Sequence, residues 1–426
     1  MTEELLQFIW KYRFFDKTIY TIENEPVEVI SAGLHNLNSG PDFFDARIRI
    51  AGTLWAGNVE MHLKTSDWQK HKHTTDDAYR NVILHVVLEH DVAAPLVTGR
   101  TLPTVILPIP ESLKSGFEEL VHSKLKIPCF NKVGAVDSFT KNMLFERLMI
   151  ERIETKTNRI LEVLTRNANN FEETFYRTVA AGFGFGTNAQ AFEMLADSLP
   201  LTVLAKHKND IFQLEALLFG QSGLLNQLEF DDEYALKLKK EYDFLLKKFS
   251  LKPLEKHVWK FSKLRPDNFP TIRIAQFAAL IHKSSALFSK IREKISAEEL
   301  ADLFACEPSE YWHTHYTFGK TSAFKLKKLG ENSVNSVVIN AVIPTLYAFG
   351  TITSTDYLKQ HALQLLEQIK AEKNSDTDLW KNLGFNMLHA GHSQAGIQLK
   401  KEYCAKGNCL HCAIGLKLLS ASLRKF

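Results

Sequence analysis

Hydrophobic and polar residues alternate with a period of two in the first third of the chain, which is the pattern of half-buried β-strands. Ala46, Ile48 and Ile50 alternate with arginines, a short Ala-Gly-Thr turn follows, and the alternation resumes from residue 54 to residue 64. These two runs predict an antiparallel hairpin. The other elements expected in this region are a helix at residues 2–14, strands at 27–31, 82–89 and 103–108, and a helical turn at 76–81.

From residue 138 onwards the apolar residues recur at spacings of three and four, which is typical of amphipathic helices. Met149, Ile153, Ile160 and Leu164 follow this spacing. Similar patterns recur at residues 171–181, 188–206, 209–219, 232–249, 270–286, 297–305, 333–348, 355–371 and 393–401. The sequence therefore predicts an α+β protein, with an α/β domain at residues 1–130 and a larger all-helical domain at residues 138–426 that ends in a cysteine cluster.

The composition is that of a globular protein. Of the 426 residues, 45% are hydrophobic and 24% are charged, and 52 Lys and Arg face 49 Asp and Glu, so the net charge is only +3. This balance neither requires nor excludes a nucleic-acid partner. The acidic start Met1-Thr-Glu-Glu is unlike a signal peptide, and no window of about 18 apolar residues occurs, so we expect a cytoplasmic protein without a membrane span. The sequence carries no signature of an oligomeric state.

The predicted hairpin lies in the stretch with the most concentrated chemistry. Residues 40–91 hold eight acids and five of the sixteen histidines. The alternation puts Glu60, His62 and Lys64 on one strand face, and Asp42 stands at the entrance of the hairpin, where it can lie beside Glu60. Two carboxylates with an adjacent base or cation can hold Mg²⁺ or Mn²⁺ for phosphodiester hydrolysis. These four residues are therefore candidate catalytic groups, with Asp42 and Glu60 as metal ligands. The alternative is a solvated strand face, with Asp42 capping a turn.

A second kind of metal site is also consistent with this stretch. Imidazoles and one carboxylate can bind Zn²⁺ or Mn²⁺ and leave one position open for water. The candidate ligands, besides His62, are His71, His73, Asp76, Asp77 and His85. As alternatives, His71 and His73 could be exposed loop residues, and His85 could be a hydrogen-bonded core residue.

Residues 1–110 resemble the PD-(D/E)XK nuclease superfamily. Pro41-Asp42 stands for its first motif and Val59-Glu60-Met61-His62 for its second, in a matching order of helix, strand, hairpin, helix and strand. The resemblance implies a restriction-endonuclease-like domain, Mg²⁺ or Mn²⁺ at Asp42 and Glu60, and cleavage of nucleic acid. The lysine of that superfamily comes two residues after the acid, where His62 stands, and Lys64 lies two residues further on. The alternatives are a non-nuclease metal hydrolase that uses the histidines, and a non-catalytic nucleic-acid-binding or scaffold protein with a decayed nuclease fold.

Three cysteines near the C-terminus, Cys404, Cys409 and Cys412, are separated by four and two residues. Thiolates at this spacing can surround one soft cation, either Zn²⁺ as a structural clasp or an iron–sulfur cluster. The alternative is three reduced, buried cysteines. A fourth ligand would come from elsewhere, and the candidates are His411, Cys129, Cys306, His389 and His392. Cys129 would join the end of the chain to the α/β domain.

Two stretches of the helical region carry polar or flexible residues in an apolar context. Gly182-Phe-Gly184-Phe-Gly186-Thr follows a helical pattern, so it predicts a close-packed helix junction rather than a phosphate loop. Arg273 and Gln276 follow a proline-punctuated helix start, which favours a buried polar network. Aromatic residues and lysines at 311–328 could contact a nucleic-acid backbone, or form an ordinary aromatic cluster beside a solvated helix.

Several stretches along nearly the whole chain are similar to a family of bacterial proteins described only as domain of unknown function 2851. The residues that carry this similarity are Ser39-Gly-Pro-Asp-Phe43, Gly57-Asn-Val-Glu-Met-His62, Ser66-Asp-Trp68, Leu84-His-Val-Val87, Arg265-Pro266 and the terminal cysteine segment. The similarity implies a family but no activity.

Overall fold

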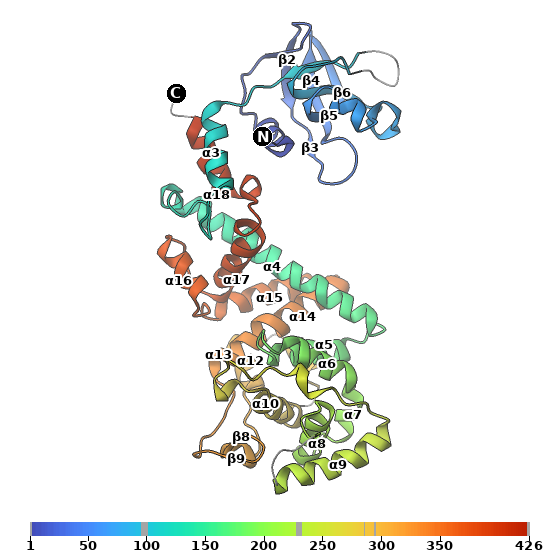
Figure 1. Cartoon of the computed structure of the whole chain (residues 1–426), viewed down its shortest axis with the longest axis vertical. Helices are drawn as coiled ribbons and strands as arrows, with labels where there is room; N and C mark the ends of the chain where they lie inside the picture. The colour runs from blue at the N-terminus through green and yellow to red at the C-terminus, as the bar shows by residue number, and fades with distance from the viewer. Residues whose placement is uncertain (1, 95–100, 227–231, 285, 294, 424–426) are drawn as a thin grey trace. The chain divides into compact units, whose positions relative to one another are not determined.

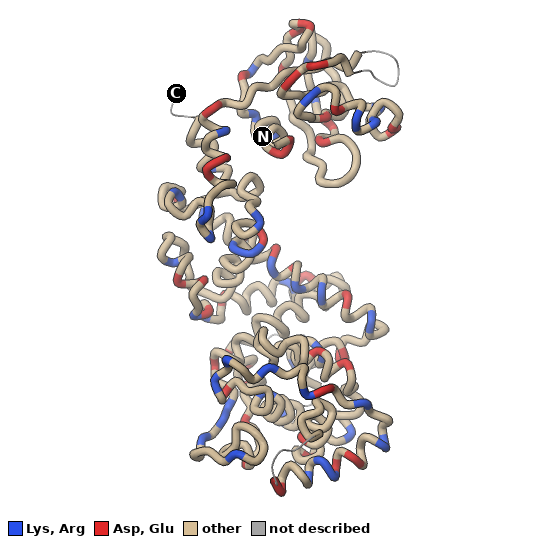
Figure 2. The backbone as a smooth tube through the Cα atoms, in the orientation of Figure 1, with Lys and Arg blue, Asp and Glu red and all other residues tan. Residues whose placement is uncertain are grey.

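The computed structural model describes residues 2–94, 101–226, 232–284, 286–293 and 295–423 (Figure 1). The chain divides into two compact units, Met1–Leu144 with Leu399–Phe426, and Phe145–Gln398. The first unit contains a mixed β-sheet and the second is mostly helical, so the predicted α+β class is confirmed. Lys and Arg are interspersed with Asp and Glu along both units (Figure 2), in keeping with the small net charge.

A seven-stranded mixed sheet forms the centre of the first unit. Six strands follow the order β1-β2-β4-β5-β6-β7, and β3 pairs with β4. The pairs β5·β6 and β6·β7 are parallel, and the others are antiparallel. Thr21, just after β1, also forms a bridge with Val105 of β7. The strands are β1 (Ile19–Tyr20), β2 (Pro26–Ser31), β3 (Leu34–His35), β4 (Phe43–Ile50), β5 (Thr53–Lys64), β6 (Val82–Glu89) and β7 (Thr104–Ile106), and the helical segments are α1 (Glu3–Tyr12), α2 (Asp67–Lys70), η1 (His73–Thr75), η2 (Asp77–Tyr79), α3 (Glu111–Val121) and η3 (Val133–Ala135).

Strands β4 and β5 are the predicted hairpin, which is confirmed. Ile50 pairs with Thr53, and the two turn residues, Ala51 and Gly52, have φ of 48° and 85°. A two-residue turn with positive φ at both positions matches the right-handed twist of the strands, and glycine adopts this conformation without steric cost. The turn sets the register of the hairpin, and therefore which residues of the two strands face each other.

Helix α1 packs its apolar residues against the sheet. Leu5 and Ile9 are fully buried, and they share one hydrophobic core with Met61 of β5. Because side chains alternate along a strand, Glu60 and His62 point to the opposite side of β5. Both are also buried, with exposed fractions of 5% and 1%. Around Glu60 and His62 the polar side of this strand is therefore an interior surface rather than a solvated one.

The last part of the chain belongs to the first unit. It consists of the π-helical turn η8 (Leu399–Cys404), the 3₁₀ turn η9 (Cys409–His411) and α18 (Ala413–Leu423). Helix α18 packs against α3, and Leu410 and Leu419 are part of the core that includes the sheet and α1. The structural division thus differs from the predicted domains at 1–130 and 138–426, because the apolar residues of the terminal segment find their burial in the first unit.

The second unit consists of helices with one two-stranded ribbon. The helix predicted at 188–206 is divided at Pro200, because proline disfavours a helical conformation in the residue before it. The elements are α4 (Ser138–Arg166), which spans the division between the units, α5 (Phe171–Phe183), α6 (Ala189–Ser198), α7 (Leu201–Lys206), α8 (Ile211–Gln221), α9 (Glu233–Phe249), η4 (Lys256–Val258), η5 (Pro266–Asn268), α10 (Pro270–Lys283), α11 (Leu287–Ile291), α12 (Ala297–Phe304), η6 (Glu310–His313), β8 (His315–Thr317), β9 (Lys320–Thr321), α13 (Glu331–Val337), η7 (Val338–Val342), α14 (Ile343–Ile352), α15 (Asp356–Gln368), α16 (Ser375–Asn382) and α17 (Ala390–Gln398).

One continuous helical segment, Glu331–Ile352, is long and apolar enough to cross a membrane by length and composition alone. The mean hydropathy of its most apolar window is 1.3, and 61% of that window is buried inside the protein. A helix face packed against protein is not available to lipid, so this burial is typical of a core helix.

Candidate metal centre

Asp42 and Glu60 lie side by side where β4 and β5 separate. The backbone N–H of Asp42 donates to Oε2 of Glu60 at 3.1 Å, and the backbone N–H of Met61 donates to Oδ2 of Asp42 at 2.9 Å. Gln7 of α1 donates its Nε2–H to Oδ1 of Asp42 at 2.8 Å. The two carboxyl groups are therefore brought together by adjacent strands and held there by three donors.

His62 extends this group on the same side of β5. Its Nδ1 lies 2.8 Å from Nε2 of His85, and its Nε2 lies 3.1 Å from Nδ1 of His71. His85 comes from β6, which is parallel to β5 and pairs His85 with Glu60 in its register. His71 directly follows α2, which contacts β5 and so returns the chain to that strand.

Three histidines converge on a common point, and Glu60 lies beside two of them. One ring nitrogen from each of His62, His71 and His73 lies within 4.8 Å of the other two. Oε1 of Glu60 lies 3.5 Å from Nε2 of His62 and 3.4 Å from Nε2 of His73. Metal–ligand bonds of about 2.0–2.1 Å place the ligands of a tetrahedral zinc site ~3.3 Å apart. The spacing of these groups therefore fits a single transition-metal ion.

Burial keeps the two carboxyl groups from ionising easily. Burial, followed by the charge of Glu60, raises the pKa of Asp42 to about 7. Burial also raises the pKa of Glu60 to about 8, with a further contribution from Glu3 of α1. Neighbouring carboxylates repel each other, and a bound cation relieves this repulsion. The pair is thus arranged to take up either protons or a metal ion near neutral pH.

The imidazoles of His62, His73 and His85 are held in the neutral form that metal ligands need. Burial, followed by the neighbouring His85, lowers the pKa of His62 to about 3, and burial, followed by His73, lowers the pKa of His85 to about 3. Burial also lowers the pKa of His73, and its buried Nε2 makes no hydrogen bond. A buried ring nitrogen without a hydrogen bond is rare and can donate its lone pair to a metal ion.

Aromatic side chains support the histidines. The ring of Tyr79 stacks on that of His73 with 3.7 Å between centroids, and the fully buried Trp68 lies 5.4 Å from His85. The indole N–H of Trp68 donates to Oγ1 of Thr74 at 3.2 Å. These contacts limit rotation of the imidazoles, which keeps the nitrogen atoms in position before any ion binds.

Three of the candidate residues lie apart from this group. Nζ of Lys64 is 3.0 Å from Oε1 of Glu89, and both side chains are exposed. Asp76 accepts a hydrogen bond from the backbone N–H of Ala78, and Asp77 forms an exposed ion pair. The structure therefore brings together Asp42, Glu60, His62, His71, His73 and His85, and it leaves out Lys64, Asp76 and Asp77.

Sequence analysis missed two polar residues of α1. Gln7 donates to Asp42, and the charge of Glu3 contributes to the raised pKa of both Asp42 and Glu60. Glu3 and Gln7 are four residues apart and so share one helix face. This spacing is a signal that the sequence contains, but it does not tell which strand that face meets.

Four of the five cysteines also belong to the first unit. They are Cys129, Cys404, Cys409 and Cys412. Another candidate for the fourth ligand, His411, has its Nε2 3.2 Å from Oε1 of Glu4. The remaining candidates, Cys306, His389 and His392, lie in the second unit.

The fold and this group of ligands define an α+β protein with a candidate metal centre on its sheet. The chain belongs to the family Protein of unknown function (DUF2851), whose model matches residues 3–375. The family predicted from the sequence is thereby confirmed. No curated protein and no solved structure matches the chain.

Proposed function

We propose that this protein is a metal-dependent phosphodiesterase that acts on nucleic acid, with its metal ion held by Glu60, His62, His71 and His73. The observation that carries the proposal is the short spacing of Oε1 of Glu60 to Nε2 of two buried histidines, 3.5 Å and 3.4 Å. Neutral imidazoles at this distance stabilise a buried carboxyl group only weakly. A single cation could bind both the carboxyl group and the imidazoles.

Mn²⁺ and Zn²⁺ suit this site better than Mg²⁺. Three of the four proposed ligands are imidazole nitrogens, which transition metals accept readily, whereas Mg²⁺ prefers oxygen ligands. A bound divalent ion supplies a Lewis acid that polarises the phosphoryl group and lowers the pKa of water.

Asp42 is the proposed proton acceptor. Its carboxyl group lies against Glu60, and its pKa of about 7 suits a general base that works near neutral pH. His85 is a positioning residue, because it acts on the site through the 2.8 Å contact with Nδ1 of His62. His71 is the exposed member of the group and lies on the side from which a substrate can approach.

Nucleic acid is the proposed substrate because two acids on adjacent strands match the motif arrangement of the PD-(D/E)XK nuclease superfamily. We also propose a cytoplasmic location. Leu5 and Leu6 are fully buried in the core of the first unit, so helix α1 is part of the fold.

A non-nuclease metal hydrolase is the second candidate. It is favoured by the position of Lys64, whose Nζ pairs with Glu89 at 3.0 Å instead of lying beside the acids. A site with three imidazole ligands has the ligand chemistry of zinc hydrolases.

The test is cleavage of labelled DNA and RNA, single-stranded, double-stranded and branched, in Mn²⁺, Zn²⁺ and Mg²⁺. We expect cleavage by the wild type in Mn²⁺ and its loss in Glu60→Gln. Glutamine has nearly the shape of the protonated glutamic acid, so this variant should stay folded. Glu89→Gln is the matched control, because Glu89 ends the neighbouring strand and is exposed.

Three other outcomes would contradict the proposal. Equal cleavage by the wild type and Glu60→Gln would exclude this site as the source of activity. Tight metal binding with hydrolysis of small ester substrates but of no nucleic acid would favour the second candidate. Salt-sensitive nucleic-acid binding that Glu60→Gln leaves unchanged, without turnover, would favour a non-catalytic binding protein.

A further inference from the structure

The four cysteines of the first unit come from two segments that are far apart in sequence. Cys129 lies in the loop between α3 and η3, and the other three lie in the terminal segment that packs on α3. Cys404 and Pro128, the neighbour of Cys129, line the same cavity. The terminal segment therefore brings its thiols to the loop that carries Cys129.

The backbone of the terminal segment is shaped around these cysteines. Gly407 has φ of 69°, and its carbonyl accepts a hydrogen bond from the backbone N–H of Cys409 at 2.7 Å. The N–H of Cys412 then donates to the carbonyl of Cys409 at 3.2 Å, which closes the turn between them. At Gly415 a Cβ atom would come within 2.0 Å of that same carbonyl, so only glycine fits there. A tight turn of this kind lets both thiols of a Cys-x-x-Cys pair reach one metal site.

Two of the four cysteines, Cys409 and Cys412, are buried, and Cys129 and Cys404 are half-buried. Cys409 and Cys412 are each 8% exposed. Burial, followed by Cys412 and Cys409, raises the pKa of Cys129 to about 12. Burial also raises the pKa of Cys404, and Cys129 is the next largest cause. Each of these two thiols, from different segments, thus lies within electrostatic reach of the other.

We infer that Cys129, Cys404, Cys409 and Cys412 together bind a metal centre through four thiolates. A soft cation would displace the thiol protons on binding, and its binding free energy would then stabilise the attachment of the terminal segment to the first unit. Lys126 and Lys400 line the cavity of about 390 Å³ that Cys404 also lines, where they can compensate the negative charge of four thiolates.

The spacing of the thiols favours an iron–sulfur cluster over a single zinc ion. Zinc–sulfur bonds of about 2.3 Å place the sulfur atoms of a tetrahedral site ~3.8 Å apart. Among the described residues, the ligand atoms of His62, His71 and His73 lie within 4.8 Å of one another. No three of the thiols lie this close together. A cluster with several iron atoms holds its cysteines further apart than one ion does.

The test begins with the full-length wild type purified without oxygen, in which iron, acid-labile sulfide and zinc are measured per chain. We expect iron and sulfide in equal amounts and a broad visible absorption that dithionite bleaches. One zinc per chain without iron would retain the four-thiolate centre and overturn its assignment as a cluster. Absence of stoichiometric metal, both as purified and after reconstitution with iron and sulfide or with zinc, would overturn the inference.

Cysteine variants then identify the fourth ligand. Cys129→Ser should lose the metal, as should the same change at the three terminal cysteines. Cys306→Ser is the matched control, because Cys306 is buried in the second unit, and it should retain the metal. His411→Ala should also retain it, since Nε2 of His411 faces Glu4. Retention in Cys129→Ser with loss in His411→Ala would overturn the assignment of Cys129. Circular dichroism of each variant separates loss of metal from loss of fold.

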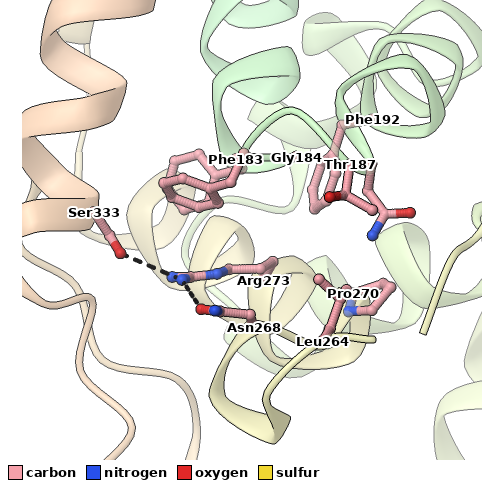
Figure 3. A pocket seen from close by; sticks show the side chains of 11 residues that line it. Phe183, Gly184, Thr187, Phe192, Leu264, Asn268, Pro270, Arg273 and Ser333 are labelled. Atoms are coloured by element: carbon pink, nitrogen blue, oxygen red, sulfur yellow. Dashed lines mark hydrogen bonds between the residues drawn. The ribbon is translucent and has the colours of Figure 1, made fainter. Parts of the chain in front are cut away.

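A second, independent observation concerns a cavity of about 190 Å³ in the second unit. It is lined by Gly184 and Thr187, which follow α5, by Asn268 and Arg273 at the start of α10, and by Ser333 of α13 (Figure 3). The glycine-rich stretch and the arginine that stood out separately in the sequence therefore line one cavity.

Arg273 is a buried cation whose hydrogen-bond partners are all neutral. It is 7% exposed, and it donates to Gln276 at 2.9 Å, to Asn268 at 2.6 Å and to Ser333 at 3.3 Å. Its buried Nε makes no hydrogen bond. Burial lowers the pKa of Arg273 to about 10, so the side chain still carries its charge at neutral pH. The nearby acid Asp267 is exposed and forms an ion pair with Lys325, so an anion in the adjacent cavity would compensate the buried charge more directly.

The geometry points to a small oxyanion, a phosphate or a carboxylate, as the ligand of this cavity. The guanidinium group binds planar or tetrahedral oxyanions through paired N–H donors. Thr187, on the opposite side of the cavity from Arg273 in Figure 3, offers a hydroxyl donor.

The test is calorimetry of the full chain with inorganic phosphate and with succinate, at an ionic strength matched by chloride. We expect saturable binding of at least one of them, and the stronger of the two identifies the class of ligand. Arg273→Met should abolish this binding, whereas Arg265→Met, at an exposed arginine eight residues earlier, should not. Wild type that binds neither anion, or Arg273→Met that stays folded and binds as the wild type does, would overturn the inference.

Discussion

Two glutamates are buried among the residues that the structure describes, and their surroundings differ in kind. Glu215 of α8 is fully buried in the second unit, and its Oε2 accepts hydrogen bonds from the hydroxyl of Tyr234 at 2.8 Å and from the indole N–H of Trp312 at 3.0 Å. Glu60 of β5 is buried in the first unit, next to Asp42 and two imidazoles. Burial is the largest cause of a raised pKa for both glutamates.

The difference lies in what the neighbours can offer. Tyr234 and Trp312 are neutral donors, and Ser309 is a further neutral donor to the carboxyl group of Glu215. Around Glu60, the neighbours Asp42, His62 and His73 are themselves groups that bind protons or cations. A raised pKa alone therefore does not mark a functional site, whereas a buried acid among other metal ligands does.

The largest effect is expected from Glu215→Ala. The substitution leaves a cavity and removes the acceptor of two buried donors, so the free energy of unfolding should fall by about 4 kcal/mol. Urea unfolding measures this loss, and metal affinity at the histidine group should stay unchanged. A loss below about 1 kcal/mol would show that Glu215 does not stabilise the second unit.

The next effect is expected from Glu60→Gln. Affinity for Mn²⁺ or Zn²⁺ should fall at least ~100-fold, or about 2.7 kcal/mol, because a charged ligand is replaced by a neutral amide. The free energy of unfolding of the metal-free protein should change by less than about 1 kcal/mol at pH 6. Isothermal titration calorimetry measures the affinity. Glu215→Gln is the matched control, because it is the same substitution at the other buried glutamate. We expect it to bind the metal ion with wild-type affinity.

A smaller effect is expected from pH on the metal-free protein. Because the pKa of Glu60 rises from 4.5 to about 8 on folding, the folded state holds more protons between these values, and stability falls as pH rises. The pKa of His62 falls from 6.5 to about 3 on folding, so this histidine acts in the opposite direction, below pH 6.5. Between pH 6.5 and pH 8 the carboxyl groups therefore dominate, and the free energy of unfolding should fall by about 2 kcal/mol.

Urea unfolding of chelator-treated protein at a series of pH values measures this dependence. Glu60→Gln removes the group with the higher pKa and should flatten the slope. The same slope in wild type and Glu60→Gln would show that Glu60 ionises normally. Saturating Mn²⁺ or Zn²⁺ should reverse the sign, because metal ions compete with protons for the same ligands and bind more tightly as pH rises.

The smallest effect is expected from Lys64→Met. Its ion pair with Glu89 is exposed, so the free energy of unfolding should change by less than about 0.5 kcal/mol. Nuclease activity should also stay within about twofold of wild type, since Nζ of Lys64 lies on Glu89. Cleavage assays measure this activity. A loss of activity comparable to that of Glu60→Gln would show that Lys64 takes part in catalysis.

Much of the first unit could be predicted from local pattern. Alternation along residues 46–64 was sufficient for the hairpin, because side chains of a strand point to its two faces in turn. The hairpin in turn brought Asp42 to Glu60, since the turn sets the register. In contrast, the polar face of β5 is partly buried, with Glu60 and His62 inside and Lys64 outside. Alternation assigns residues to a face but does not tell how far the covering elements extend over it.

What the sequence alone determined is most of the longer helices and strands and the presence of acids, histidines and cysteines in particular stretches, because periodicity and composition are local properties. Only the tertiary structure decided which of these residues meet. The parallel pairing of β5 with β6 brings His85 to His62, the packing of α1 brings Gln7 to Asp42, and the burial of the terminal segment in the first unit brings its thiols to Cys129. Each of these contacts joins segments distant in sequence, and the burial of apolar surface that brings them together depends on the whole chain.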